Sequence, residues 1–232
     1  MDLSPVWGNL FQIDFFGPMM TIWNMHDSFT IRGLYAVTPD TADLDSLIQK
    51  TELAIEGGVT IIQYRSKIHD HVVKMQQCDA ILRLCSNYDV LCIVNDDVDL
   101  CRALGAHGVH LGKTDKSIEE ARLILGPDAM IGVSCYNELP RALHAESLNA
   151  SYVAFGAVYP TLTKPYAPRV SLDFLKEARL KIDIPIVAIG GIDVNNAKDV
   201  IKTGIDAIAV ITSLYEANSI KETAETLSSM FH

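Results

Sequence analysis

The chain has 232 residues, of which 49% are hydrophobic, so it is long enough and apolar enough to bury one sizeable core. Its formal net charge of −10 argues against nonspecific nucleic-acid binding, which depends on basic surfaces that neutralise phosphates. The five cysteines contain no Cys-x-x-Cys pair, which disfavours a disulfide framework or a structural zinc site and favours buried thiols in a reducing cytoplasm.

Residues 1–31 form an extension of unusual composition. They hold both tryptophans and four of the seven phenylalanines, but no lysine or arginine. A secretory signal needs a basic start and a mitochondrial transit peptide needs arginines, so neither fits. The apolar stretch over residues 10–23 is too short to span a bilayer. We expect either a packed extension or a natural start at Met20 or Met25, followed by one domain over residues 32–232.

Eight short apolar runs alternate with segments of helical spacing along the rest of the chain. The runs cover residues 34–38, 60–65, 90–95, 108–112, 130–135, 152–158, 185–191 and 207–212. The helical segments cover residues 42–57, 72–87, 97–104, 116–125, 138–148, 171–180, 195–203 and 219–230. Parallel strands need long crossovers, so this alternation predicts βαβ units. Eight such units predict a closed (β/α)8 TIM barrel, with the active site at the carboxyl ends of the strands.

Carboxylates follow two adjacent predicted strands. Asp96 comes after the third run and Asp115 after the fourth. Side chains at adjacent strand ends can share one cation, and Mg²⁺ prefers one or two carboxylates with water and substrate phosphates. The alternative is that each aspartate caps the following helix, and the spacing leaves ligand and cap evenly balanced. For Asp99 the helix cap is the better interpretation.

Three basic residues lie near predicted strand ends. Arg65 and Lys67 are two residues apart and lie on one side if the second strand continues through them. Lys164 belongs to residues 159–170, whose length is typical of a functional loop. Solvated surface charge is the usual state of such residues, but their position in an acidic chain favours anion binding.

Glycines and small polar residues end the last two strands. The pair Gly190-Gly191 ends the seventh run, and Ile211-Thr212 ends the eighth. TIM barrels commonly bind phosphate with these two loops and a helix N-terminus, and glycine lets the backbone approach the anion. A plain tight turn is the alternative, and the pairing of both loops favours phosphate. His110 lies inside a predicted strand and is interpreted as a packed residue of the core or mouth.

Six motifs occur in the order typical of one enzyme family. They are GVTIIQYRSK at residues 58–67, VNDDVDL at 94–100, GAHGVHLG at 105–112 followed by Asp115, IGVS at 131–134, PTLTKP at 160–165 and AIGGI at 188–192. With these motifs the chain resembles the thiamine phosphate synthase family from about residue 34 to residue 214.

The resemblance implies a transferase that joins hydroxymethylpyrimidine diphosphate to hydroxyethylthiazole phosphate and releases pyrophosphate. In that reaction the pyrimidine methylene leaves as a stabilised cation, which the thiazole nitrogen captures to give thiamine phosphate. No general base is required.

The resemblance also implies roles for individual residues. The pyrimidine would contact Gln63, Asn95 and Ser134. The pyrophosphate would contact Arg65, Lys67 and Lys164, with Mg²⁺ on Asp96 and Asp115. Thr161 and Thr163, in the loop over residues 159–170, would also bind substrate. The thiazole phosphate would contact Gly191, Ile211 and Thr212.

Two alternatives stay open beside the synthase. The thiazole tautomerase branch works through a histidine two residues after the fifth-strand serine, where this chain has Tyr136 and also keeps TLTK at residues 161–164. A noncatalytic phosphate-binding barrel needs the glycine site but not two aspartates with three cations. Both observations favour the synthase. We expect small phosphorylated partners, no nucleic acid and no membrane, and association into a homo-oligomer stays open.

Overall fold

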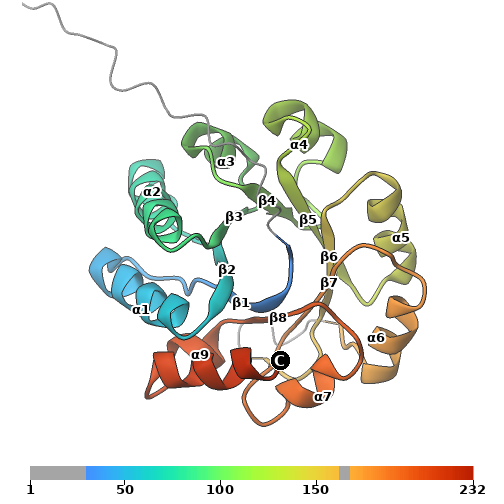
Figure 1. Ribbon diagram of the computed structural model, residues 1–232. Helices are drawn as coiled ribbons and strands as arrows, with labels where there is room; N and C mark the ends of the chain where they lie inside the picture. Colours follow the sequence, from blue (N-terminus) through green and yellow to red (C-terminus); the bar gives the residue numbers. More distant parts are fainter. Residues whose placement is uncertain (1–29, 162–167, 232) are drawn as a thin grey trace, which may run out of the picture.

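The computed structural model describes residues 30–161 and 168–231, which form a closed barrel of eight parallel strands ringed by helices (Figure 1). Each strand pairs with the next in chain order, and β8 (Ala207–Val210) pairs with β1 (Gly33–Val37) to close the ring. The predicted (β/α)8 TIM barrel is confirmed. The predicted ligands Thr163 and Lys164 lie outside the described residues.

The strands lie where the apolar runs predicted them. The remaining strands are β2 (Val59–Tyr64), β3 (Leu91–Asn95), β4 (Gly108–Leu111), β5 (Met130–Tyr136), β6 (Tyr152–Gly156) and β7 (Ile186–Ile189). Since β2 ends at Tyr64, the strand does not continue through Arg65 and Lys67, and the spacing of two does not decide on which side they lie.

The helices follow the strands in turn. They are α1 (Leu44–Glu56), α2 (His71–Asn87), α3 (Val98–Leu104), α4 (Ile118–Leu125), α5 (Leu139–Ser147), α6 (Leu172–Arg179), α7 (Ala197–Ile201), α8 (Thr212–Tyr215) and α9 (Ile220–Ser229). The four-residue helix α8 was not predicted, because so short a segment shows no helical periodicity. No helix of the described residues is long and apolar enough to cross a membrane.

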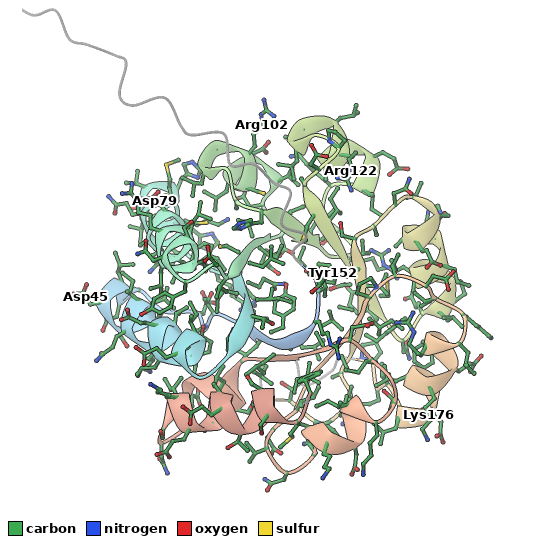
Figure 2. All side chains as sticks on the ribbon, viewed as in Figure 1. Asp45, Asp79, Arg102, Arg122, Tyr152 and Lys176 are labelled. Atoms are coloured by element: carbon green, nitrogen blue, oxygen red, sulfur yellow. The ribbon has the colours of Figure 1, made fainter. Side chains whose placement is uncertain are left out.

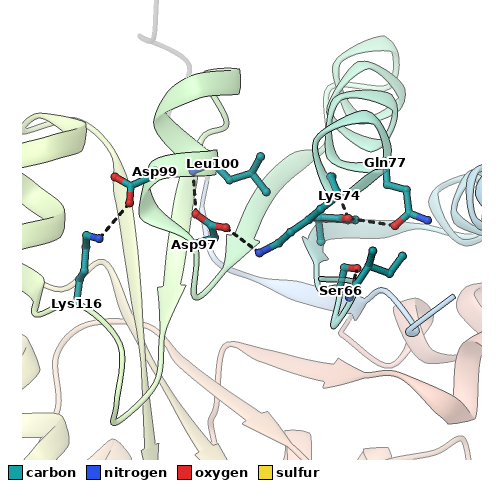
Figure 3. Close-up of polar contacts among 9 residues, drawn as sticks. Ser66, Lys74, Gln77, Asp97, Asp99, Leu100 and Lys116 are labelled. Carbon is teal, nitrogen blue, oxygen red and sulfur yellow. Dashed lines mark hydrogen bonds and ion pairs between the residues drawn. The ribbon is translucent and has the colours of Figure 1, made fainter. Parts of the chain in front are cut away.

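The N-cap predicted for α3 is wrong. The carboxylate of Asp97, not that of Asp99, accepts a hydrogen bond from the amide of Leu100 at 2.9 Å (Figure 3). Asp99 is the second residue of the helix and pairs with Lys116 at 3.1 Å instead. The helix begins directly after the strand-end turn, so the residue nearest the turn supplies the cap.

Two apolar cores lie on the two faces of the barrel. The outer core packs side chains such as Leu34 and Ile62 against the helices, and it is the larger one. The inner core fills the barrel with the intervening residues of the same strands, such as Tyr35 and Ile61. Strand side chains alternate between faces, so each strand supplies both cores. Tyr152 lies at the centre of the barrel (Figure 2).

We expect Leu175→Ala to destabilise the protein by about 2–5 kcal/mol, because Leu175 on α6 is fully buried in the outer core. Leu123 on α4 is 86% exposed, so Leu123→Ala should change the free energy of unfolding by no more than about 0.5 kcal/mol. Denaturant unfolding measures both values. Equal losses would contradict the assignment of the outer core.

Candidate active site

The carboxyl ends of the strands surround a cavity of about 670 Å³. Many of the residues assigned to substrates from the sequence line it. They are Gln63, Arg65, Asn95, Ser134, Thr161, Gly191, Ile211 and Thr212. These residues come from β2, β3 and β5 and from the segments that follow β2, β6, β7 and β8. Closure of the barrel therefore brings together both groups of predicted substrate contacts.

Arg65 is held at the cavity by the loop after β1. The hydroxyl of Thr38 accepts a hydrogen bond from the Arg65 amide at 2.8 Å and donates one to the Arg65 carbonyl at 3.1 Å. The Arg65 guanidinium lies 4.0 Å from the carboxylate of Asp40, and its side chain is only 17% exposed. These contacts fix the backbone and orient the positive charge. Sequence analysis did not identify Thr38 or Asp40.

Lys67 follows Arg65 by two residues but does not line the cavity. Its side chain is exposed, and its amide donates to the Asp40 carboxylate at 2.6 Å. A flexible ammonium at the rim can reach an anion that enters the mouth. Asp40 thus contacts both diphosphate-binding residues predicted after β2: the side chain of Arg65 and the backbone amide of Lys67.

The two predicted metal ligands follow adjacent strands, although neither lines the cavity. Asp96 is exposed and has a left-handed backbone with φ of 63°, and its amide donates to the carbonyl of His110 on β4. Asp115 is half-buried and accepts a hydrogen bond from the Gly112 amide at 2.6 Å. The described residues contain no group of three or more His, Cys, Asp or Glu side chains that could hold a metal.

Two oxygen ligands suffice for Mg²⁺ when water and substrate phosphates complete its shell. A non-glycine residue at positive φ is uncommon and concentrates at functional sites. Asp96, with its left-handed backbone, and the oriented Asp115 are therefore compatible with such a metal.

The neighbouring carboxylate, Asp97, is occupied by a lysine. Lys74 of α2 donates to it at 2.7 Å, on the side of β3 where α2 packs (Figure 3). Burial raises the pKa of Asp97, but hydrogen bonds from Lys74 and from the Leu100 amide outweigh it and hold the pKa below its usual value. Asp97 is thus an ionised helix cap, which leaves Asp96 as the carboxylate of this turn with an exposed side chain.

A basic residue close to the predicted metal ligands is also paired. Lys113 lies two residues before Asp115, and its ammonium lies 3.4 Å from the carboxylate of Glu138 in an exposed position. That contact draws the positive charge toward the α5 side of the loop. It reduces the repulsion that an unpaired lysine would exert on a bound cation.

A network of hydrogen bonds crosses the interior of the barrel below the cavity, and we call its five residues the interior network. Gln63 Nε2 donates to Tyr35 Oη at 2.7 Å, and Tyr35 Oη lies 2.8 Å from Tyr152 Oη. His110 Nδ1 lies 3.0 Å from Tyr152 Oη, and His110 Nε2 lies 2.9 Å from Ser134 Oγ. All five residues also line the cavity.

Three members of this network, Tyr35, His110 and Tyr152, were not predicted as site residues. The packed position expected for His110 is confirmed, since it is 7% exposed, but it faces the cavity as well. The alternation of side chains could have identified it, because His110 lies between Val109 and Leu111, which belong to the outer core. The two tyrosines carry no local signal, because both fall in apolar runs typical of a core.

The glycines after β7 allow a close approach of the loop after β6. A Cβ on Gly191 would overlap Pro160 and Tyr159, and one on Gly190 would meet Ala157. Both glycines also have positive φ, at 105° for Gly190 and 63° for Gly191. Packing alone therefore requires glycine at both positions, which agrees with the alternative of a plain tight turn. Gly191 also lines the cavity, so it can contact a ligand as well.

The end of β8 contributes Ile211 and Thr212 at the start of α8. The first amides of a helix have no partners within it and can bind an anion. Ser213 in the same turn donates its hydroxyl to the Ile192 carbonyl at 2.7 Å, which ties α8 to the segment after β7. The loops after β7 and β8 therefore form one wall of the cavity.

Comparison with known proteins agrees with this geometry. The model of the thiamine monophosphate synthase family matches residues 34–214. The thiamine-phosphate synthase of Nitrosospira multiformis is 45% identical over 201 residues, which cover 87% of this chain and 86% of that protein. That of Methylococcus capsulatus is 44% identical over 209 residues, which cover 90% of this chain and 93% of that protein.

Solved structures give the same result. Thiamine phosphate pyrophosphorylase from Pyrococcus furiosus has a TM-score of 0.79 and 36% identity, over 87% of this chain and 96% of that chain. A 3-hexulose-6-phosphate synthase, at 18% identity and a TM-score of 0.64 over 85% of this chain and 99% of that chain, shares the fold alone. The chain therefore belongs to the thiamine phosphate synthase family, whose members are transferases that condense a pyrimidine with a thiazole.

Proposed function

We propose that the chain makes thiamine phosphate from hydroxymethylpyrimidine diphosphate and hydroxyethylthiazole phosphate, with Mg²⁺ bound at the mouth of the barrel. One observation carries this proposal: a single cavity is lined both by Gln63, Asn95 and Ser134 and by the segments after β7 and β8. A condensation needs both substrates in one cavity, with their reacting atoms in contact.

The pyrimidine end of the cavity lies over β2 to β5. Gln63, Asn95 and Ser134 offer amide and hydroxyl groups that can hold the ring in one orientation. The cavity walls next to them include apolar side chains such as Val37 and Ala154, which exclude water from a cationic pyrimidine methylene. A dry wall protects that methylene from capture by water instead of the thiazole nitrogen.

The diphosphate would lie at the rim, beside Arg65. Asp40 orients Arg65, and Lys67 is exposed close to it in sequence. Together with Lys164 they would supply positive charge to the leaving group as it accumulates negative charge. Such charge stabilisation is the largest part of catalysis when the leaving group is a phosphate. Bound Mg²⁺ on Asp96 and Asp115 would supply further neutralisation of the leaving diphosphate.

The thiazole phosphate would lie at the opposite end, against Gly191, Ile211 and Thr212, with Thr161 and Thr163 contributing from the loop. Amides of the first turn of α8 and the hydroxyl of Thr212 supply donors without adding a cation. The chain thereby separates the two anions, with cations and metal at one end and backbone donors at the other. The tautomerase alternative is disfavoured because Tyr136 replaces the histidine through which that branch works.

We place the enzyme in the cytoplasm. All five cysteines are free and buried, and burial raises the pKa of thiols such as Cys101, to about 12, and Cys135, to about 12. Thiols in that state are inert side chains of the core, as expected for a protein kept in reducing surroundings.

We expect thiamine phosphate to form only when a divalent metal is present, because the diphosphate must be neutralised as it leaves. Excess chelator should lower the rate by at least about a hundredfold, and added Mg²⁺ should restore it. Chromatographic detection of thiamine phosphate measures the rate. Product formation at full rate in excess chelator would show that the metal assignment is wrong, and absence of product with metal would show that the activity is wrong.

We expect Lys164→Ala to lower kcat by at least about a hundredfold, because the loss of one cation next to a leaving diphosphate can cost several kcal/mol. A loop lysine contributes little to the core, so the melting temperature should stay within about 2 °C of the original value. Lys176→Ala is the matched control, since Lys176 is an exposed lysine of α6 paired with Asp173. Unchanged kinetics of Lys164→Ala with both substrates saturating would remove Lys164 from the site.

We expect a chain that starts at Met25 to keep full activity. It retains Ile31, which is 4% exposed and packs into the inner core, and every proposed substrate contact lies later in the sequence. The aromatic content of the extension predicts an effect on melting temperature or on homo-oligomer formation instead. Loss of catalysis with an unchanged circular dichroism spectrum would give the extension a part in the active site.

A further inference from the structure

The interior network connects the two ends of the proposed pyrimidine site through residues that do not themselves need to touch substrate. Gln63 and Ser134 lie at its ends, while Tyr35, Tyr152 and His110 lie between them. The exposed fractions of the three intermediate residues are 1%, 0% and 7%, so water cannot readily replace their partners. Buried polar groups of this kind must satisfy each other.

Every hydrogen bond in the network has a definite direction once the first is fixed. The Gln63 amide nitrogen only donates, so the Tyr35 oxygen accepts from it. Burial raises the pKa of the Tyr35 and Tyr152 hydroxyls, so each keeps one proton to donate at neutral pH. The other partner of Tyr35 is Tyr152, so Tyr35 donates to Tyr152.

The same reasoning continues to the other end. Because the Tyr152 oxygen accepts from Tyr35, its own proton goes to His110 Nδ1. A neutral imidazole that accepts at Nδ1 carries its proton at Nε2, which therefore donates to Ser134 Oγ. The hydroxyl proton of Ser134 is then directed to another acceptor. Ser134 lines the cavity, so that acceptor can be a bound ligand.

The amide oxygen of Gln63 is the other end of the series. Every buried side-chain oxygen and nitrogen of the described residues has a hydrogen-bond partner. Gln63 uses Nε2 for its hydrogen bond to Tyr35, and because the residue lines the cavity, Oε1 can accept a hydrogen bond from a bound ligand. The network thus ends in an acceptor at Gln63 and a donor at Ser134.

We propose that Tyr35, Tyr152 and His110 are positioning residues that fix this polarity and thereby make the pocket select an aminopyrimidine over the oxo-pyrimidine of the same shape. The proposal rests on the proposed pyrimidine site at Gln63 and Ser134. An aminopyrimidine offers an N–H to Gln63 and a ring-nitrogen lone pair to Ser134. Replacing its amino group by an oxo group puts an acceptor, and an N–H on the ring, where the pocket requires the opposite.

The network also explains why the amino compound is favoured. An oxo group against Gln63 Oε1 would place two acceptors together, and a ring N–H against Ser134 would leave the hydroxyl proton of Ser134 without the ligand as its acceptor. A site whose buried polar groups are left unpaired by an analogue rejects it strongly. Selectivity therefore depends on the continuity of the network as well as on the two residues that touch the ring.

The test compares binding of the aminopyrimidine diphosphate and its oxo analogue by titration calorimetry, with pyrophosphate as a third ligand. We expect the original protein to prefer the amino compound by at least about a hundredfold. Tyr152→Phe keeps the ring that stacks on His110, at 5.5 Å between centroids, but interrupts the network. It should weaken binding of the amino compound by roughly tenfold to a hundredfold, reduce the preference by a similar factor and leave pyrophosphate binding unchanged.

Tyr35→Phe interrupts the network at another point and should give the same loss, which keeps the test valid if one variant does not fold. The double variant should lose little more than either single one, because one interruption already uncouples the ends. Tyr215→Phe is the matched control: Tyr215 is a buried tyrosine outside the barrel, and its hydroxyl lies 3.3 Å from that of Thr51. We expect it to keep the original selectivity.

An unchanged preference in folded Tyr152→Phe and Tyr35→Phe would overturn the proposal, as would a preference of the original protein for the oxo compound. These outcomes are distinct from failure of the proposed function. Binding selectivity can be measured without turnover, whereas absence of thiamine phosphate from both substrates and Mg²⁺ concerns the reaction alone.

Discussion

Closure of the barrel is the constraint on which the site depends. The hydrogen bonds between β1 and β8 complete a ring, so the inward side chains of all eight strands must share one interior. In most of this interior they are apolar, but Tyr35 and Tyr152, 117 residues apart in sequence, meet there through their hydroxyls. The same closure gathers the loops that follow the strands around one cavity.

Charge at the mouth is arranged by local pairing and not by net charge. The chain carries a formal charge of −10, yet it must bind two anions. Asp97 is neutralised by Lys74 and Asp99 by Lys116, whereas Asp40 orients Arg65 from a distance of 4.0 Å. Acidic residues near the mouth are thus paired with lysines or used to hold an arginine, and Asp96 and Asp115 are the proposed ligands of the metal.

The barrel could be predicted from the sequence because its signal is local and repeated. Each strand is a short apolar run, and each helix follows it with helical spacing, so eight repetitions specify the fold. Many residues that line the cavity could be predicted because they end these runs. The helix cap at Asp97 could not be predicted, since it depends on how soon α3 begins after the turn. The helix α8 could not be predicted either, because four residues are too few to show helical periodicity.

The interior network depends on distances that no local pattern contains. His110 lies between Val109 and Leu111 in a run that is typical of a core strand, and its partners Tyr152 and Ser134 are on other strands. Only the register of the closed sheet brings them together. The contacts of Thr38 and Asp40 with Arg65 were missed for the same reason, because they join the ends of β1 and β2 across 27 and 25 residues of sequence.

The division of one cavity into a cationic end and a backbone-donor end is the central claim. A crystal structure with thiamine phosphate, pyrophosphate and Mg²⁺ tests it most directly. We expect pyrophosphate at Arg65 with the metal on Asp96 and Asp115, and the phosphate of thiamine phosphate on the amides of Gly191 and Thr212. Pyrophosphate on Gly191 and Thr212, or a metal bound away from both aspartates, would contradict the account.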